Sequence, residues 1–139
     1  MAHRDHSNLQ GPKKEVYSDI DVAFLSHPIN GKLTRKINRE AVKQSVKSLI
    51  LTNYFERPFK SDIGCSIREL LFENFHPAIT QQMQSAIREV ISNFEPRADL
   101  ISIDIQAKPD QHELSVSVVF FVRNDPSPIT LNVSLERVR

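Results

Sequence analysis

The sequence predicts a single α+β domain in which about three helices pack on a C-terminal antiparallel β-meander, preceded by a short N-terminal hairpin. The apolar residues recur every 3.6 positions over most of residues 38–94, and the period changes to two after Arg97. Helices that come first and strands that come last favour helices laid on one face of a sheet. The chain has 139 residues, which is enough for one core and too few for two ordinary domains.

The N-terminal segment, residues 1–16, is predicted to be a flexible arm because it has almost no apolar surface to offset the entropy of ordering. It is either a solvated tail or a segment that orders on a partner. The domain itself then covers residues 17–139. Within it, a strand is predicted at residues 22–25, a turn with positive φ at Asn30-Gly31, and a second strand near residues 32–36.

Two helices are predicted before residue 76. Asn38 is a good N-cap for the first, which runs to about Thr52. The second is short and follows a capping box formed by Ser66 and Glu69. Their buried positions are Val42, Val46, Leu49 and Ile50 in the first helix and Ile67, Leu70 and Leu71 in the second.

The third predicted helix, residues 78–94, has the strongest amphipathic pattern in the chain, and Pro96 ends it. Its apolar positions are Ile79, Met83, Ala86, Ile87, Val90 and Phe94. The loop between the first two helices, residues 53–64, is polar yet carries three aromatic side chains, so we expect it to fold back onto the core.

The C-terminal part alternates between apolar and polar residues, as strands with one buried face do. We expect three strands, joined by turns at residues 109–112 and 124–127. The expected inner residues are Ile101, Ile103, Ile105 and Ala107, then Leu114, Val116, Val118, Phe120 and Val122, then Ile129, Leu131, Val133 and Leu135. Val119 and Phe121 point the other way. Either the hairpin or the arm covers them, or they form a patch or sheet edge that receives another chain.

Composition excludes several functional classes. Eighteen Lys and Arg against seventeen Asp and Glu give a formal charge of +1, which argues against a strongly basic nucleic-acid binder. No run is long enough to cross a membrane, and the N-terminus lacks the apolar core of a signal peptide. A single cysteine, Cys65, cannot form an internal disulfide, so a cytoplasmic location is expected. Cys65 precedes a helix start, which would lower its pKa, but without a nearby histidine a buried structural thiol is the preferred interpretation.

Catalytic and metal motifs are lacking in the sequence. The three glycines are scattered, there is no nucleophile elbow, and the five histidines lack zinc-ligand spacing, so we assign no catalytic, cofactor or metal residues. Glu73 and Glu95 are the obvious carboxylate pair for glycoside hydrolysis. Such a pair must face each other across a cleft, and surface or salt-bridged carboxylates are the preferred interpretation.

The triplet Glu95-Pro96-Arg97 lies where the longest helix stops and the sheet begins. Pro96 fixes the backbone direction there. A planar guanidinium after a rigid corner suits bidentate donation, either to an internal carboxylate or to a partner.

Several short motifs together resemble those of a known family. They occur in order and at family-like spacing: His27-Pro28 with Gly31, Arg57-Pro58-Phe59 with Gly64, Leu71-Phe72-Glu73, and Glu95-Pro96-Arg97. The chain from about residue 17 onward resembles the small baseplate wedge proteins of contractile-tailed phages, the T-even lysozyme-like or sheath-initiator type. It is also similar to the baseplate subunit of type VI secretion systems.

The resemblance implies a non-enzymatic structural role and a fold like the handshake domain of the tail-sheath protein. It implies that Glu95, Pro96 and Arg97 contact the core bundle of neighbouring wedge proteins. It also implies strand pairing with the tail sheath protein, for which the candidate residues are Val119, Phe121, Ile129, Leu131, Val133 and Leu135. The motif from Arg57 to Gly64 would give structural support rather than contact.

The implied setting is a virion tail baseplate, assembled in the host cytoplasm, with multiple copies in sixfold symmetry and without nucleic-acid or membrane partners. Two alternatives stay open at this point. One is a peptidoglycan hydrolase that uses Glu73 and Glu95, and the other is the equivalent subunit of a type VI secretion system.

Overall fold

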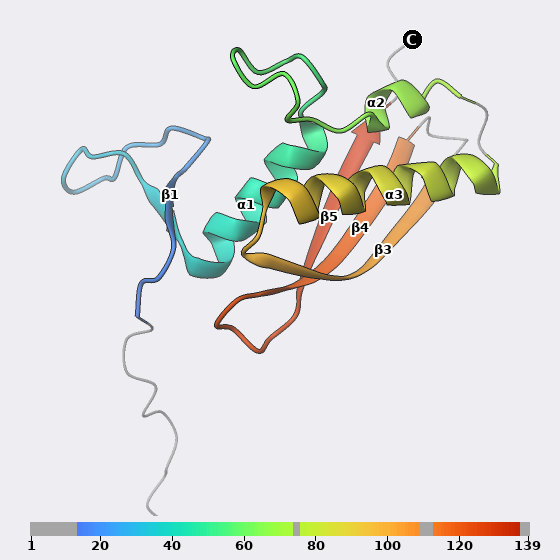
Figure 1. The fold of residues 1–139 in the computed structure, drawn as a ribbon. Helices are drawn as coiled ribbons and strands as arrows, with labels where there is room; N and C mark the ends of the chain where they lie inside the picture. The colour runs from blue at the N-terminus through green and yellow to red at the C-terminus, as the bar shows by residue number, and fades with distance from the viewer. Residues whose placement is uncertain (1–13, 74–75, 109–112, 137–139) are drawn as a thin grey trace, which may run out of the picture.

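The computed structural model describes residues 14–73, 76–108 and 113–136. A three-stranded antiparallel sheet of order β3-β4-β5 has α1 and α3 on one face, and the β1-β2 hairpin lies beside α1 (Figure 1). The elements are β1 (Ser18–Ile20), β2 (Arg35–Ile37), α1 (Asn38–Leu51), α2 (Ile67–Leu70), α3 (Pro77–Phe94), β3 (Ala98–Lys108), β4 (Glu113–Val122) and β5 (Ile129–Glu136). This arrangement confirms the predicted α+β class and the predicted meander.

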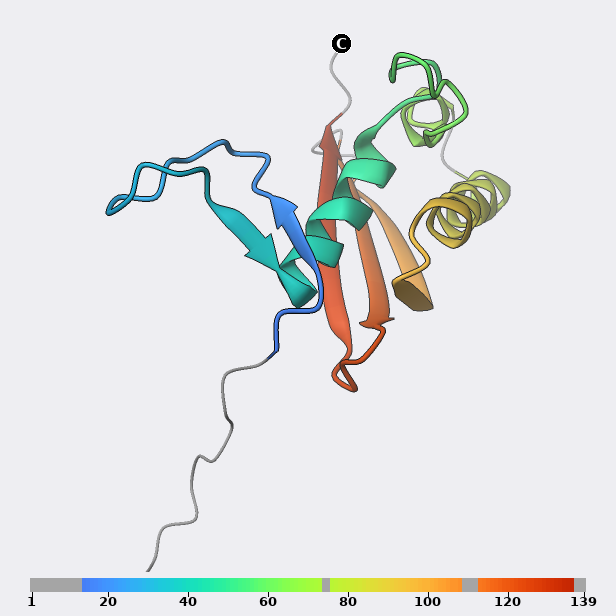
Figure 2. The ribbon, with the colours of Figure 1, turned by 60° about the vertical axis from the view of Figure 1, so that its left-hand side comes forward.

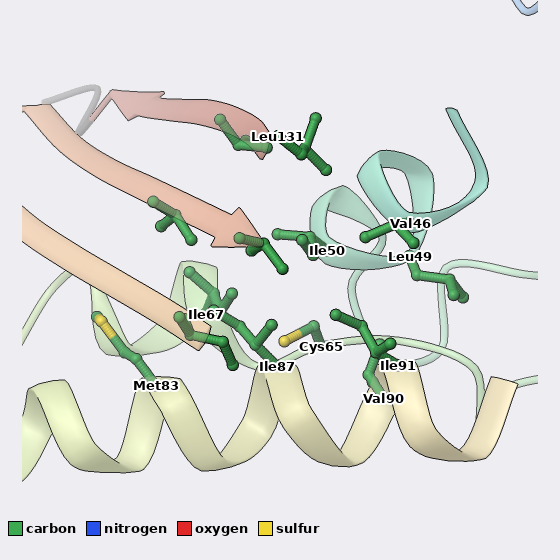
Figure 3. Close-up of a cluster of buried hydrophobic side chains, with 14 of the residues drawn as sticks. Val46, Leu49, Ile50, Cys65, Ile67, Met83, Ile87, Val90, Ile91 and Leu131 are labelled. Atoms are coloured by element: carbon green, nitrogen blue, oxygen red, sulfur yellow. The ribbon is translucent and has the colours of Figure 1, made fainter. Parts of the chain in front are cut away.

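The core lies between the sheet and the two long helices. Figure 3 shows side chains of α1, α3 and the strands meeting around Cys65 and Ile67. The predicted stripes of both helices are buried except that Ala86 and Phe94 are half-buried, and Ile91 joins the core although it was not predicted. Leu70, expected inside, is half-buried as well.

The sheet follows the expected alternation in β4 and β5 but not throughout β3. Leu100 pairs with Phe120 and Ser102 with Val119, so Ile101 is an extra residue in a β-bulge. The bulge leaves Ile101 48% exposed, and Ala107 is exposed near the end of the strand. The prediction that Ile101 and Ala107 belong to the inner face was therefore wrong, whereas Ile103 and Ile105 are buried.

The hairpin differs from the prediction in register. Residues 22–25 are not a strand, because the chain turns there and Phe24 has a φ of +50°. The strands lie nearer the base, where Ser18 pairs with Ile37 and Ile20 with Arg35. The predicted turn is present, with Gly31 at a φ of +62°.

Neither predicted N-terminal cap forms. Asn38 has a φ of +48°, and its side-chain oxygen accepts the backbone N–H groups of Val16 (2.8 Å) and Tyr17 (3.2 Å), so Asn38 anchors the preceding segment instead of capping α1. The Ser66 side chain makes no capping hydrogen bond at the start of α2.

The aromatic side chains of residues 53–64 do not fold back onto the core. Phe55 and Phe59 are almost fully exposed, and Tyr54 is also on the surface. Residues 1–13 of the arm predicted at residues 1–16, and the turn predicted at residues 109–112, lie outside the described residues.

Candidate functional site

The corner between α3 and β3 is built around an ion pair. The Nε of Arg97 donates to Oε1 of Glu95 at 2.6 Å and its Nη2 donates to Oε2 at 2.8 Å, which is a bidentate geometry. Glu95 is 2% exposed, while Arg97 is half-buried and Pro96 between them is exposed. Of the three predicted contact residues, only Pro96 and Arg97 therefore reach the surface.

The same guanidinium connects the corner to the hairpin. Its Nη1 lies 3.5 Å from Oδ2 of Asp19 in β1, and its Cζ lies 5.5 Å from the centre of the Tyr17 ring. The hydroxyl of Tyr17 in turn accepts a hydrogen bond from the Asn124 amide at 3.5 Å. Arg97 thus joins the end of α3, the sheet and the base of the hairpin. Sequence reasoning missed Tyr17 and Asp19, whose partners lie far along the chain.

Glu95 is held in its charged form. Burial raises the pKa of Glu95, but hydrogen bonds from Arg97 and Ser45, together with the charge of Arg97, outweigh burial and leave the pKa lowered. The hydrogen bond from Arg97 to Glu95 likewise raises the pKa of Arg97. The pair is therefore a permanent ion pair at neutral pH.

Glu73 and Glu95 do not form a pair. Glu73 precedes α3 and Glu95 follows it, and this helix of 18 residues is about 27 Å long. Glycosidase carboxylates lie about 5 to 10 Å apart, and the acid has a raised pKa, opposite to the direction at Glu95. Among the described residues there is also no group of three or more His, Cys, Asp or Glu side chains that could hold a metal ion.

Cys65 is buried in the core, and burial raises its pKa to about 11. A protonated, inaccessible thiol is a poor nucleophile. The predicted burial of Cys65 is confirmed.

Strand β5 forms one edge of the sheet, because β4 is the only strand it pairs with among the residues that the structure describes. The side chains predicted to bind a sheath strand, Ile129, Leu131, Val133 and Leu135, point into the core and are buried. The outer side of β5 carries backbone groups, since alternate residues of an edge strand direct N–H and C=O groups outward. Val119 and Phe121 lie on the opposite face of the sheet, where Phe121 is 37% exposed and Val119 half-buried.

A groove of about 730 Å³ runs beside the N-terminal half of β5. Thr130, Leu131 and Asn132 line one side, and the hairpin lines the other with Asp21, Val22 and Lys36. Between β5 and the hairpin, the groove is lined by the outward-facing α1 residues Glu40, Lys43, Gln44, Lys47 and Leu51. Gln44 fixes the hairpin on α1, because its side chain accepts the N–H of Val22 (3.2 Å) and donates to the carbonyl of Ile20 (2.8 Å).

Exposed apolar side chains gather on two projections, the hairpin and the loop of residues 53–64. On the hairpin, Phe24 is 70% and Ile29 is 89% exposed. In Figure 2 the hairpin stands apart from the three-stranded sheet, on the side of α1. No helix of the described residues is long and apolar enough to span a membrane.

Comparisons with known proteins agree with this arrangement. The family model described as baseplate wedge protein gp25 matches residues 37–127. The baseplate wedge protein gp25 of Enterobacteria phage T4 is 30% identical over 115 residues, which cover 83% of this chain and 86% of that relative.

Solved structures show the same fold. A candidate tail lysozyme from Geobacter sulfurreducens superposes with a TM-score of 0.66 at 20% identity over 72% of this chain and 91% of its own. A chain of the anti-feeding prophage baseplate superposes with a TM-score of 0.62 at 21% identity, over 85% of this chain and 83% of its own. A chain of the postcontracted pyocin R2 baseplate superposes with a TM-score of 0.56 at 14% identity, over 88% of this chain and 100% of its own.

The fold and the family match define a structural component of contractile-tail baseplates. More specifically, the chain belongs to the gp25 family of baseplate wedge proteins.

Proposed function

We propose that this wedge subunit docks on the core bundle of its neighbouring wedge proteins and templates the first ring of contractile sheath by β-strand pairing, without enzymatic activity. The observation that carries the proposal is the edge of β5, whose core side is fully occupied and whose outer side has no strand among the described residues. Strand addition uses main-chain hydrogen bonds for affinity and neighbouring side chains for register.

The docking half of the proposal rests on the corner at residues 95–97. Pro96 is exposed and Glu95 holds the guanidinium of Arg97 in one orientation, so little side-chain entropy is lost when a partner binds there. Exposed aromatic residues on the loop of residues 53–64 add apolar surface that a large assembly can bury.

The experiment is co-purification with the neighbouring wedge proteins. Arg97→Ala is expected to weaken docking by about 2–5 kcal/mol, since the corner loses its cation and its fixed geometry. Arg123→Ala is the matched control, because Arg123 is an exposed arginine next to the same corner and its ion pair with Asp99 is long, at 4.0 Å. Full binding by a folded Arg97→Ala variant would rule out docking through this corner.

The hydrolase alternative predicts that the protein clears a suspension of cell walls and that Glu73→Gln abolishes this. We expect no clearing by either protein, because Glu73 and Glu95 lie at opposite ends of α3. Clearing by the wild type that Glu73→Gln removes would reverse this conclusion.

A further inference from the structure

The groove beside β5 carries unbalanced positive charge. Among the described residues no ion pair involves Lys43, Lys47 or Arg68, all of which line the groove. Two of its three carboxylates are already engaged: Asp21 pairs with Lys36 at 3.7 Å, and Glu56 accepts the N–H of Asn53 at 2.7 Å. In all, the lining holds four cations, Lys36, Lys43, Lys47 and Arg68, against three carboxylates, a formal excess of one positive charge, and three of the cations have no ion-pair partner among the described residues.

The shape of the groove suits one extended chain. Helix α1 and strand β5 run side by side in Figures 1 and 2, and the hairpin closes the far side. A strand added to β5 would lie about 4.8 Å from it, within the groove, with alternate side chains pointing toward the helix layer. The other side chains would join the polar outer face beside Thr130 and Asn132.

The spacing of the cations fits such a strand. Lys43 and Lys47 are four residues apart on α1, a rise of about 6 Å. Residues i and i+2 of a strand are about 6.7 Å apart and point to the same side. Two successive helix-facing residues of the incoming strand would therefore meet one lysine each, while Leu51 accommodates an apolar neighbour.

We propose that the groove selects a partner strand with carboxylates at two successive helix-facing positions. This inference rests on the proposed strand pairing and deepens it: the backbone edge binds the strand, and Lys43 and Lys47 choose its sequence and register. Attraction between opposite charges in the groove gives specificity and is weakened by salt.

The test uses synthetic ten-residue peptides of alternating Val and Thr that carry Glu at two successive positions on one side. Matched peptides carry Gln or Lys there, and a fourth is the Glu peptide with N-methylated amides. Binding is followed by the amide NMR signals of β5 in the full chain. We expect the Glu peptide to bind roughly tenfold more tightly than the Gln peptide at low salt. The Lys peptide should bind least.

Variants separate the lysines from general charge effects. The double variant Lys43→Glu, Lys47→Glu should lose the preference for the Glu peptide, whereas Arg88→Glu on the exposed face of α3 should keep it. Thermal unfolding of each variant checks that the fold is intact.

Failure of this inference is distinguishable from failure of strand pairing. Equal binding of the Glu and Gln peptides at β5 overturns the charge selection and leaves edge pairing standing. Equal binding of the N-methylated peptide overturns strand pairing itself. Binding by none of the peptides overturns the inference.

Discussion

At the scale of single residues, Glu95 is the central residue of the corner between α3 and β3. It is the buried charged side chain of the described core, and its carboxylate is satisfied by Arg97 and Ser45. Removal of one member of a buried pair leaves an uncompensated charge and costs more than the pair itself contributes. Arg97 also contacts Asp19 and Tyr17, so its loss would loosen the hairpin as well.

This environment predicts a pH-dependent stability. Because the folded pKa of Glu95 is lowered, its contribution is fully present above the ordinary glutamate pKa of about 4.3 and is lost as the pH falls through the folded value. The difference in unfolding free energy between wild type and Glu95→Gln should be largest at pH 7 and should shrink below about pH 4. Urea titrations at several pH values measure it, with Glu73→Gln at an exposed carboxylate as control. A difference independent of pH would contradict the ion-pair interpretation.

At the scale of elements, the loop of residues 53–64 has a conformation fixed by backbone hydrogen bonds, although its aromatic side chains are exposed. At the base of the loop, the Cys65 N–H donates to the carbonyl of Thr52 at 2.8 Å. Further out, the Phe55 N–H donates to the carbonyl of Ser61 at 3.0 Å and joins the two sides of the loop. Phe55 and Phe59 have φ values of +64° and +66°, a region that bulky residues seldom adopt. Strain of this kind clusters at functional sites.

Gly64 should be essential to this loop. A Cβ there would lie 2.5 Å from the backbone of Asn53 and of Tyr54, whereas a Cβ on Gly31 would meet nothing within 4 Å. Gly64→Ala should therefore lower the unfolding free energy by about 3 kcal/mol. Gly31→Ala should cost about 1–2 kcal/mol, through its positive φ alone. Urea unfolding compares the two, and an equal or smaller loss for Gly64→Ala would show that the loop shifts to make room.

At the scale of the whole molecule, a compact helix-and-sheet body carries a free strand edge and two apolar projections. The body needs β5 for its core, because the inward side chains of that strand are buried against α1 and the rest of the sheet. The edge of β5 is therefore rigidly supported while its outer backbone groups stay open to a partner.

Hydrogen exchange should report this edge directly. In the isolated protein, the β5 amides that point away from β4 should exchange rapidly, and those bonded to β4 slowly. Addition of the tail sheath protein should slow the first group and leave the amides of the 53–64 loop unchanged. Protection of the loop amides instead of the β5 amides would place the sheath contact elsewhere.

The strongly periodic elements could be predicted from the sequence, and the tertiary details could not. The spacing in residues 78–94 matched α3 within one residue, and the alternation matched β4 and β5. The role of Asn38 was missed because its partners, Val16 and Tyr17, are more than twenty positions away. The corner at residues 95–97 could be predicted from the sequence. The burial of Glu95 and the contact between Arg97 and Asp19 could not, because they depend on residues far away along the chain.

The bulge at Ile101 bears on which edge of the sheet can accept a further strand. A sheet of three strands has two borders, and a bulge makes a border irregular and more strongly twisted, which discourages a further strand. The border at β5 has no such register shift along its pairing with β4. Under the proposed strand pairing, we therefore expect each subunit to accept one strand, at β5 and not at β3.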